Sequence, residues 1–207
     1  MAGHEPNVST VAWQLDDLFC GSLMQACEDL IRKFVRETNS LIGDLAEIGV
    51  WKGESAYVIL QESTHGTLFL YDTFCGMPES MTLPEDDNKA GSFSDTSLRA
   101  VQLKLDPFAD RCVFRPGVFP HTAQDQGPFR LVHVDCDQYL STRAALDWFC
   151  PRTVDGGVLL LDDYLCGSTR GARRAIDEYL KEHECWHVAT HGYRGVMTQA
   201  LEAHRAH

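Results

Sequence analysis

VLLLDDY, residues 158–164, is the most apolar short run of the chain, and it ends in two aspartates, Asp162 and Asp163. A run of this length bounded by turn residues predicts a buried strand. The same form, apolar residues closed by an acid, occurs in RLVHVD (130–135) and TLFLYD (67–72). Segments with helical spacing separate these runs. The alternation predicts an α/β fold, with a mainly parallel, doubly wound sheet and helices on both of its faces.

Further elements follow from residue spacing along the rest of the chain. Apolar residues at helical intervals predict helices, and short apolar runs predict strands. The glycines of VDGG predict a turn. The expected helices cover 15–38, 54–63, 94–104, 139–149 and 170–182, the further strands lie within 41–51, 111–116, 186–190 and 195–200, and the turn covers 154–157.

The domain organisation is predicted to be simple. The 207 residues are enough for one compact domain with a full hydrophobic core. The sequence has no internal repeat, low-complexity tract or linker, so residues 1–207 are expected to form a single domain, with an N-terminal helical segment over about 10–40. Residues 75–93 are rich in glycine, proline, serine and acids, and predict a long loop that forms a lid or wall over a site.

The net charge and the cysteine content limit which classes of binding partner, and which cellular compartment, are expected for this protein. A net charge of −12 leaves no basic surplus for nucleic-acid phosphates, and it fits anionic membranes poorly. No stretch reaches the roughly 18 consecutive apolar residues that a membrane helix needs, and the N-terminus lacks a signal-peptide pattern. The eight cysteines lie singly, without a CxxC pair, which favours free thiols in a cytoplasmic protein.

Acidic residues stand where the predicted strands end. In a doubly wound sheet these ends gather at one edge, where ligands bind. Asp135 and Asp137 close one apolar run, and Asp162 and Asp163 close another. Such carboxylates are costly without partners, and hard oxygen ligands suit Mg²⁺ or a similar divalent cation. The alternative for the Asp162–Asp163 pair is that it merely begins a loop or caps a helix.

EIGVWKGES, at the end of the first predicted strand, has the form E-x-G-x-x-x-G. Glu47 begins it, Gly49 lets the backbone pass close to a ligand, and Gly53 lets a helix start tightly. Ser55 adds a hydroxyl group. Asp72 follows about 20 residues later, where an acidic residue typically holds ribose hydroxyls in nucleotide-type sites. Without Asp72, an ordinary strand-to-helix turn would explain the glycine pattern equally well.

Five stretches form an ordered set: EIGVWKG (47–53), GVFPHTA (117–123), HVDCDQYLST (133–142), PRTVDGGVLLLDDY (151–164) and GARRAIDEY (171–179). In this order they resemble the macrocin O-methyltransferase (TylF-type) family, whose members methylate sugar hydroxyls on natural products such as macrolides and aminocoumarins. The resemblance covers roughly residues 40–180. Its most specific parts are V-D-x-D-x-Y-x-S-T and G-G-x-x-x-x-D-D-Y.

The resemblance implies a Rossmann-like class I methyltransferase fold that binds S-adenosylmethionine (SAM) and Mg²⁺ or another divalent cation. It also implies a small-molecule hydroxyl acceptor, namely a natural-product sugar or a similar vicinal diol. A homodimer is left open. Carried over by residue, Glu47, Gly49 and Ser55 hold the methionine part of SAM beside Gly53 and Asp135, Asp72 holds the ribose, Gly117 and Val118 border the adenine, and Asp135, Asp162 and Asp163 bind the metal.

Several side chains are candidates for more than one role. A sugar hydroxyl must lose a proton during methyl transfer, and either Asp135 or Asp137 could accept it as general base. His121 is the second candidate, because histidine titrates near neutral pH, although the family has an acidic residue there more often. Trp51 either covers the methionine part of SAM or packs in the core. His133 is expected to be a hydrogen-bonded core residue.

Three other interpretations are weighed against this one. A nicotinamide-dependent oxidoreductase would have G-x-G-x-x-G in place of the observed turn, and it would have no use for two adjacent aspartates. A non-catalytic SAM-binding protein would keep the fold, but the intact set of strand-end acids argues against it. A catechol-like O-methyltransferase would use the same chemistry, and the sequence does not separate it from a sugar methyltransferase.

Overall fold

One sheet runs through the part of the chain that the computed structural model describes, residues 17–192 and 194–199, with side chains from residue 27 onward. Its seven strands lie in the order β3-β2-β1-β4-β5-β7-β6. The strands are β1 (Asp44–Ile48), β2 (Leu68–Asp72), β3 (Cys112–Pro116), β4 (Phe129–Val134), β5 (Thr153–Leu161), β6 (Trp186–His191) and β7 (Arg194–Gln199).

Helices connect most of these strands, at the places that the sequence predicts. The α-helices are α1 (Asp17–Thr38), α2 (Glu54–Glu62), α3 (Leu98–Lys104), α4 (Tyr139–Phe149) and α5 (Arg170–Glu182). Short 3-10 turns occupy Glu79–Met81, Asp106–Arg111 and Cys150–Arg152. The part of the predicted N-terminal helical segment that precedes residue 17 lies outside the described residues. Within the described chain, no helix is both long and apolar enough to span a membrane.

The sheet is mainly parallel. The pairs β1–β2, β1–β4, β2–β3 and β4–β5 are parallel, whereas β7 is antiparallel to both β5 and β6. The strand order reverses between β1 and β4, because the chain builds outward through β2 and β3 first and through β5 later. A crevice forms outside the carboxyl ends of the strands at such a reversal. The predicted doubly wound sheet is therefore confirmed.

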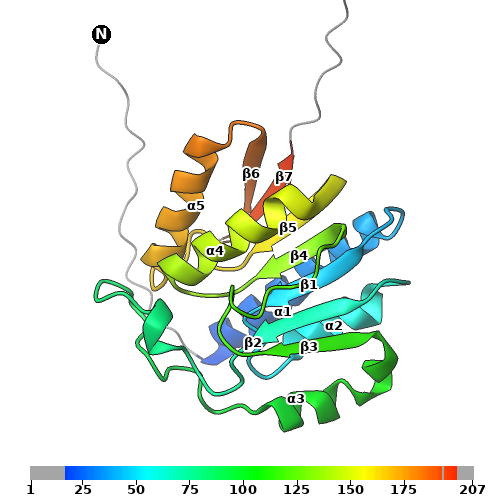
Figure 1. The fold of residues 1–207 in the computed structure, drawn as a ribbon, viewed down its shortest axis with the longest axis horizontal. Coiled ribbons are helices and arrows are strands. Elements are labelled where there is room, and N and C mark those ends of the chain that lie inside the picture. Colours follow the sequence, from blue (N-terminus) through cyan, green and yellow to red (C-terminus); the bar gives the residue numbers. More distant parts are fainter. Residues whose placement is uncertain (1–16, 193, 200–207) are drawn as a thin grey trace, which may run out of the picture.

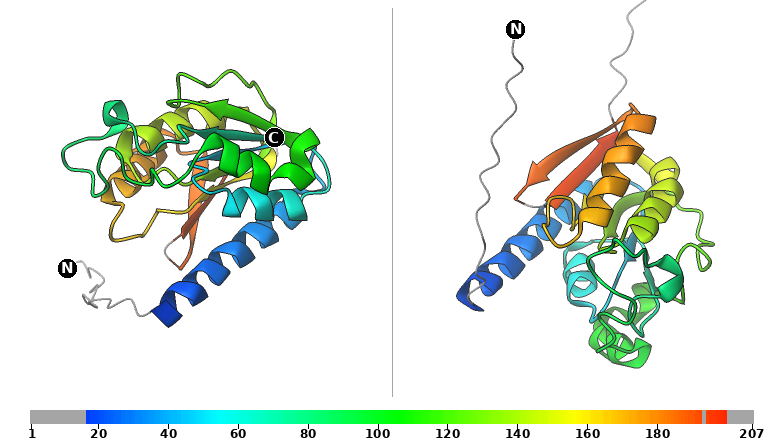
Figure 2. Two further views of the ribbon diagram at one scale, coloured as in Figure 1. Left: turned by 90° about the horizontal axis from the view of Figure 1, so that it is seen from below. Right: turned by 90° about the vertical axis from the view of Figure 1, so that its left-hand side faces the viewer.

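Helices cover both faces of the sheet, as Figures 1 and 2 show. Alternate residues of a strand point to opposite faces. Leu45 and Leu131 therefore enter a core with α1 and α2, and Ala46 and Val132 enter a second core with α4 and α5. Strands buried on both faces explain why their sequences read as continuous apolar runs.

The VDGG segment, predicted as a turn, lies inside β5 instead. Phe129 pairs with Thr153 and Leu131 with Val158, so β5 carries extra residues there and bulges without leaving the sheet. Gly157 fits because a Cβ at this position would lie 2.7 Å from the Thr153 side chain. Glycines serve bulges as well as turns, so the prediction of a turn was wrong.

The amino end of the sheet is held by a fully buried arginine, Arg130, at the start of β4. Its guanidinium donates to the Gly43 carbonyl (3.1 Å), the His65 carbonyl (2.7 Å) and the Asn39 side-chain oxygen (3.3 Å). These acceptors belong to the segments that lead into β1 and β2. Arg130 uses all three of its guanidinium nitrogens, which are spread over a rigid plane, whereas the three donors of a lysine ammonium share one atom and cannot span these acceptors.

We expect Arg130→Lys to lower the free energy of unfolding by about 2–3 kcal/mol, because buried carbonyls lose their donors. Urea denaturation measures the loss. The control is Arg173→Lys on α5, whose exposed guanidinium lies 3.5 Å from Asp177 and should contribute little. Equal stability of the wild type and Arg130→Lys would contradict the proposed role of the guanidinium.

Candidate active site

The turn after β1 is shaped by a close approach of two backbones. Gly49 has φ of 85°, and a Cβ there would lie 1.8 Å from the Asp135 carbonyl oxygen. No side chain fits in this space, so the ends of β1 and β4 can meet only through glycine. The sequence predicted a close approach of Gly49 to a ligand, whereas the structure shows that the close neighbour is Asp135.

Asp72, at the end of β2, holds this turn in place. Its Oδ2 accepts the backbone N–H groups of Val50 (2.7 Å) and Trp51 (2.9 Å), and its Oδ1 accepts that of Phe74 (2.6 Å). Trp51 has a φ of 44°, in the left-handed region that bulky residues rarely adopt. The carboxylate therefore joins the turn after β1 to the turn after β2, before any ribose is considered.

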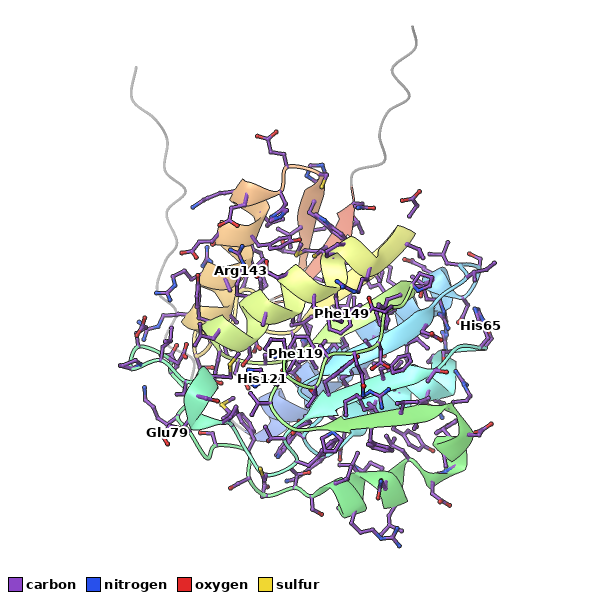
Figure 3. The ribbon with its side chains drawn as sticks, in the orientation of Figure 1. His65, Glu79, Phe119, His121, Arg143 and Phe149 are labelled. Atoms are coloured by element: carbon purple, nitrogen blue, oxygen red, sulfur yellow. The ribbon has the colours of Figure 1, made fainter. Side chains whose placement is uncertain are left out.

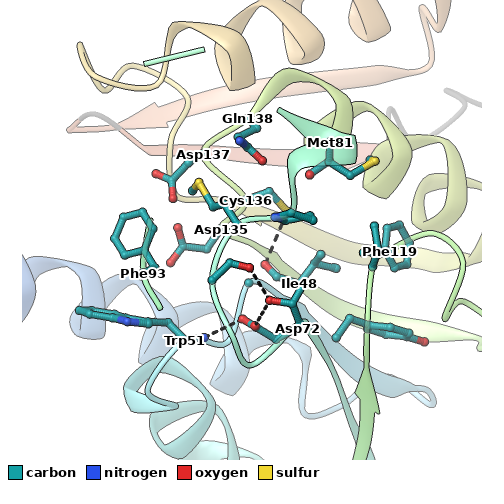
Figure 4. A pocket seen from close by; sticks show the side chains of 18 of the residues that line it. Ile48, Trp51, Asp72, Met81, Phe93, Phe119, Asp135, Cys136, Asp137 and Gln138 are labelled. Atoms are coloured by element: carbon teal, nitrogen blue, oxygen red, sulfur yellow. Dashed lines mark hydrogen bonds between the residues drawn. The ribbon is translucent and has the colours of Figure 1, made fainter. Parts of the chain in front are cut away.

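A pocket of about 280 Å³ opens at the carboxyl ends of the central strands, and Figure 4 shows Asp72, Asp135 and Asp137 around it. Most of the sequence-predicted site residues line it. They are Gly49, Trp51, Asp72, Gly117, Val118, Asp135, Asp137, Asp162 and Asp163. The pocket thus lies at the strand-order reversal, where the fold predicts a ligand site.

Three carboxylates come together on the pocket wall. Asp135, Asp137 and Asp163 each offer one oxygen, and these oxygens all lie within 4.8 Å of one another. The Asp137 backbone N–H donates to Asp163 Oδ2 over 2.8 Å, and Asp137 has a left-handed φ of 60°. Oxygen donors at this spacing fit a hard divalent cation. Strained backbone of this kind often accompanies functional sites.

The cluster is electrostatically unfavourable on its own. Burial and the neighbouring carboxylates raise the pKa values of Asp135 and Asp163 well above the ordinary range. Burial also raises the pKa of Asp137 to about 6, and the charge of Asp162 adds to this effect. Like charges at short range disfavour ionisation, and a cation between them would remove the penalty.

Asp162, a predicted metal ligand, has one oxygen engaged elsewhere. Its Oδ1 accepts a hydrogen bond from Arg194 Nε on β7 and another from the Cys27 thiol on α1, at 3.3 Å. The residue nevertheless lines the pocket. The structure therefore gathers Asp137 with Asp135 and Asp163, and it places Asp162 beside them in an ion pair with Arg194.

Four predicted residues lie off the pocket wall. Glu47 is fully buried, with Oε1 2.8 Å from His133 Nδ1 on the neighbouring strand, as expected for a core histidine. A Cβ on Gly53 would lie 2.9 Å from the Val101 side chain, so Gly53 serves the packing of α3 against α2. The other two, Ser55 and the exposed His121, also lie off the wall, His121 on the loop between β3 and β4 (Figure 3).

The long loop between β2 and α3 forms a wall of the pocket, as its composition predicts. It contributes mostly apolar surface: Gly76, Met77, Pro78, Met81 and Phe93. Asp86, which is buried, fastens this loop to α4 by accepting the Tyr139 backbone N–H (3.3 Å). Asp87 fastens it to α5 by accepting the Arg170 backbone N–H (3.2 Å) and guanidinium (2.7 Å).

Sequence reasoning missed these two aspartates. They follow prolines and glutamate in a polar loop, where acidic residues usually mean solvated surface. The related sequence feature is a glycine at the start of α5, far from the loop along the chain. A Cβ on Gly171 would lie 2.3 Å from Asp86 Oδ1, so the second residue of α5 must lack a side chain for the loop to pack against the helix.

Residues 20–190 match the family model of the macrocin O-methyltransferases (TylF). The chain belongs to this family. The resemblance inferred from the five motifs is confirmed, and the family is one of methyl-transferring enzymes. The fold is the Rossmann-like class I methyltransferase fold, since solved methyltransferases share it over most of the chain.

The chain is also similar to curated proteins that are named as O-methyltransferases. A tetracenomycin-C rhamnosyl 4'-O-methyltransferase of Streptomyces olivaceus is 30% identical over 150 residues, which are 63% of this chain and 56% of the relative. Mycinamicin III 3''-O-methyltransferase of Micromonospora griseorubida is 29% identical over 163 residues, 68% of this chain and 61% of the relative. The chain thus spans less than two thirds of the length of these relatives.

Solved methyltransferase structures share the fold of this chain. The O-methyltransferase NovP superposes with a TM-score of 0.70 and 25% identity, covering 84% of this chain and 79% of NovP. The calicheamicin methyltransferase CalS11 gives a TM-score of 0.71 at 19% identity, covering 88% of this chain and 82% of CalS11.

The raised pKa of Asp137 gives the metal-free protein a distinct pH dependence. The folded-state pKa of about 6 exceeds the ordinary 3.8, so the folded state takes up a proton before the unfolded chain does. Stability in EDTA should therefore rise as pH falls from about 7 toward 5, below the folded-state pKa, with Asp137 contributing about 1–1.5 kcal/mol by pH 5. Asp137→Asn should flatten this rise in calorimetric unfolding. An equally steep rise in the variant would contradict the assignment.

Proposed function

We propose that this chain is a SAM-dependent O-methyltransferase that requires a divalent cation and methylates a hydroxyl of a natural-product sugar. The observation that carries the proposal is the cluster of Asp135, Asp137 and Asp163 beside the Gly49 turn in one pocket. Membership of the macrocin O-methyltransferase family supports it, as do relatives named for methylating a rhamnosyl unit and a mycinamicin. A homodimer, as well as a single domain over residues 1–207, stays a prediction.

The pocket fits SAM by the chemistry of its lining. Gly49 and Asp72 line the pocket at the turn after β1, where the methionine part would lie. Asp72 Oδ1 accepts the Phe74 N–H and lies 3.5 Å from the Thr73 hydroxyl, whose hydrogen is directed to the Gly76 carbonyl, so a ribose hydroxyl can approach this oxygen. Gly117 and Val118, after β3, would border the adenine. SAM supplies a methyl group already activated on its sulfonium, so the main task of these residues is to position it.

Glu47, Gly53 and Ser55 lie off the wall, and we propose that they act on the cofactor through the turn that they support. Glu47 Oε2 is buried without a hydrogen-bond partner among the described residues. An unpaired buried carboxylate oxygen is costly. Because Glu47 lies off the pocket wall, a buried water molecule fits as the partner of this oxygen.

The carboxylates fit a divalent cation, and we propose Asp135, Asp162 and Asp163 as its ligands. Asp135 and Asp163 already lie within the spacing of a metal site. Asp162 has one oxygen committed to Arg194 and Cys27, and would use the other. A bound divalent cation supplies positive charge that orients vicinal acceptor oxygens and lowers the cost of deprotonating one of them.

Asp137 is our choice of general base, in preference to Asp135 and His121. Its side chain lines the pocket, and its pKa is raised to about 6, so it is more basic than an ordinary carboxylate and still ionised near neutral pH. The left-handed turn at Asp137 and its N–H bond to Asp163 fix its position relative to the cluster. His121 is exposed and does not line the pocket.

Isosteric substitutions should separate the ligands from the base. We expect Asp162→Asn and Asp163→Asn to lose both methyl transfer and the rise in melting temperature on addition of Mg²⁺. Asp137→Asn should lose methyl transfer by about 100-fold or more while keeping most of the Mg²⁺ stabilisation. Scanning calorimetry and a labelled-methyl assay give the two measurements.

The opposite result would exchange the roles assigned to Asp137 and Asp162. If Asp137→Asn lost the Mg²⁺ stabilisation and Asp162→Asn kept it, Asp137 would be the third ligand and Asp162 the partner of Arg194 alone.

Cofactor binding and metal binding should be separable as well. S-adenosylhomocysteine should bind the EDTA-treated enzyme in a calorimetric titration, because the Gly49 turn is held by hydrogen bonds to Asp72 and not by the carboxylate cluster. The same sample should not methylate any acceptor from a panel of glycosides and catechols until Mg²⁺ is restored. No binding at about millimolar ligand would sink the cofactor assignment, and full activity in EDTA would sink the metal assignment.

A further inference from the structure

Two aromatic residues stand together at the pocket in strained backbone conformations. Trp51, after β1, has φ of 44°, and Phe93, in the loop before α3, has φ of 58°. Their rings meet edge to face with centroids 5.5 Å apart, and both line the pocket. They belong to segments 42 residues apart in sequence, so two separate parts of the chain contribute to one aromatic pair.

The stability of the fold does not explain why Trp51 and Phe93 have strained backbones and exposed side chains. The left-handed region favours glycine and asparagine over bulky residues. Side chains this large are usually buried, yet Trp51 is 39% exposed and Phe93 is 40% exposed. A chain under selection for stability alone would place asparagine or glycine at both positions. Strain that persists at a pocket is a reason to look for a ligand.

The surrounding contacts hold the pair in this orientation. The Trp51 indole N–H donates to Asp95 Oδ1 (2.8 Å), and the Lys52 ammonium lies 4.2 Å from the indole ring centre. Two backbone hydrogen bonds, both 2.9 Å, join Met77 to residues 91 and 92. They close the base of the loop and fix the segment that carries Phe93. Trp51 and Phe93 are therefore held in a fixed arrangement, and we call this pair the aromatic platform.

The platform offers mainly carbon surface, because the one polar atom of its rings, the indole nitrogen, is bonded to Asp95, and the Lys52 ammonium beside the indole is paired with Asp95 as well. The methionine end of SAM carries an ammonium and a carboxylate, which need polar partners. The adenine is expected beside Gly117 and Val118. In Figure 4 the two rings stand on the side of Asp135, away from Phe119. The part of a ligand that meets the platform is thus apolar and belongs to the acceptor.

We propose that Trp51 and Phe93 form an acceptor subsite for an apolar, aromatic group attached to the sugar that is methylated. The inference rests on the proposed function. The carboxylate cluster faces the hydroxyl groups of such an acceptor, and the platform stacks against its planar part. An acceptor that is polar at one end and planar at the other matches both surfaces of the pocket.

The test compares phenyl and methyl glycosides of the same sugar, chosen as the best sugar from the acceptor panel. We expect the phenyl glycoside to have a KM about tenfold lower in the wild type. Trp51→Asn and Phe93→Asn should each remove most of this preference by raising the KM of the phenyl glycoside more than the KM of the methyl glycoside. The control is Leu103→Asn on α3, which is 58% exposed and does not line the pocket.

Two further measurements separate a subsite from a structural or cofactor role. Asparagine tolerates the left-handed region, so the melting temperature of each variant should stay the same or rise. The affinity for S-adenosylhomocysteine should change less than about twofold. A clear loss of stability would make the pair structural, and a parallel loss of S-adenosylhomocysteine affinity would make it part of the cofactor site; either overturns the proposal.

Failure of the subsite is distinguishable from failure of the proposed function. Equal use of phenyl and methyl glycosides by the wild type overturns the subsite while sugar methylation stands. No methylation of any glycoside, with full Mg²⁺ and SAM present, overturns sugar methylation and the subsite with it.

Discussion

The contact between Gly49 and the Asp135 carbonyl is the constraint on which the rest of the site depends. A Cβ would lie 1.8 Å from that oxygen, so the ends of β1 and β4 are closer than any side chain permits. The approach fixes the backbone of Asp135 against the turn that Asp72 caps, and Asp137 follows two residues later. The parts of the pocket that suit a cofactor and the parts that suit a metal therefore share one rigid junction.

Carboxylates crowded at this junction reduce the stability of the metal-free protein. Their raised pKa values express the same free energy that a bound cation would recover. The ion pair of Asp162 with Arg194 moderates the crowding, because it places a positive charge from β7 beside the cluster. β7, antiparallel at the far side of β5, thus contributes to the electrostatics of the site as well as to the sheet.

The sequence allowed the fold and most of the pocket to be predicted, because both depend on local patterns. Apolar runs closed by acids identified the strands, and parallel strands bring such acids to one edge. The interaction of Asp162 with Arg194 could not be predicted, since it requires knowing which strand returns beside β5. The VDGG bulge was misassigned because turns and bulges use the same residues. Asp86 was missed because its partner is a backbone N–H 53 residues away.

The loop between β2 and α3 is joined to the start of α4 by hydrogen bonds between residues far apart in the sequence. Asp86 caps the start of α4 at Tyr139, and Gln138 donates to Thr82 in the loop over 2.7 Å. Both contacts lie within two residues of Asp137, whose left-handed backbone is held partly by its neighbours. The loop that carries Phe93 and the turn that carries Asp137 are therefore joined by hydrogen bonds, so the aromatic platform and the candidate base belong to one connected wall of the pocket.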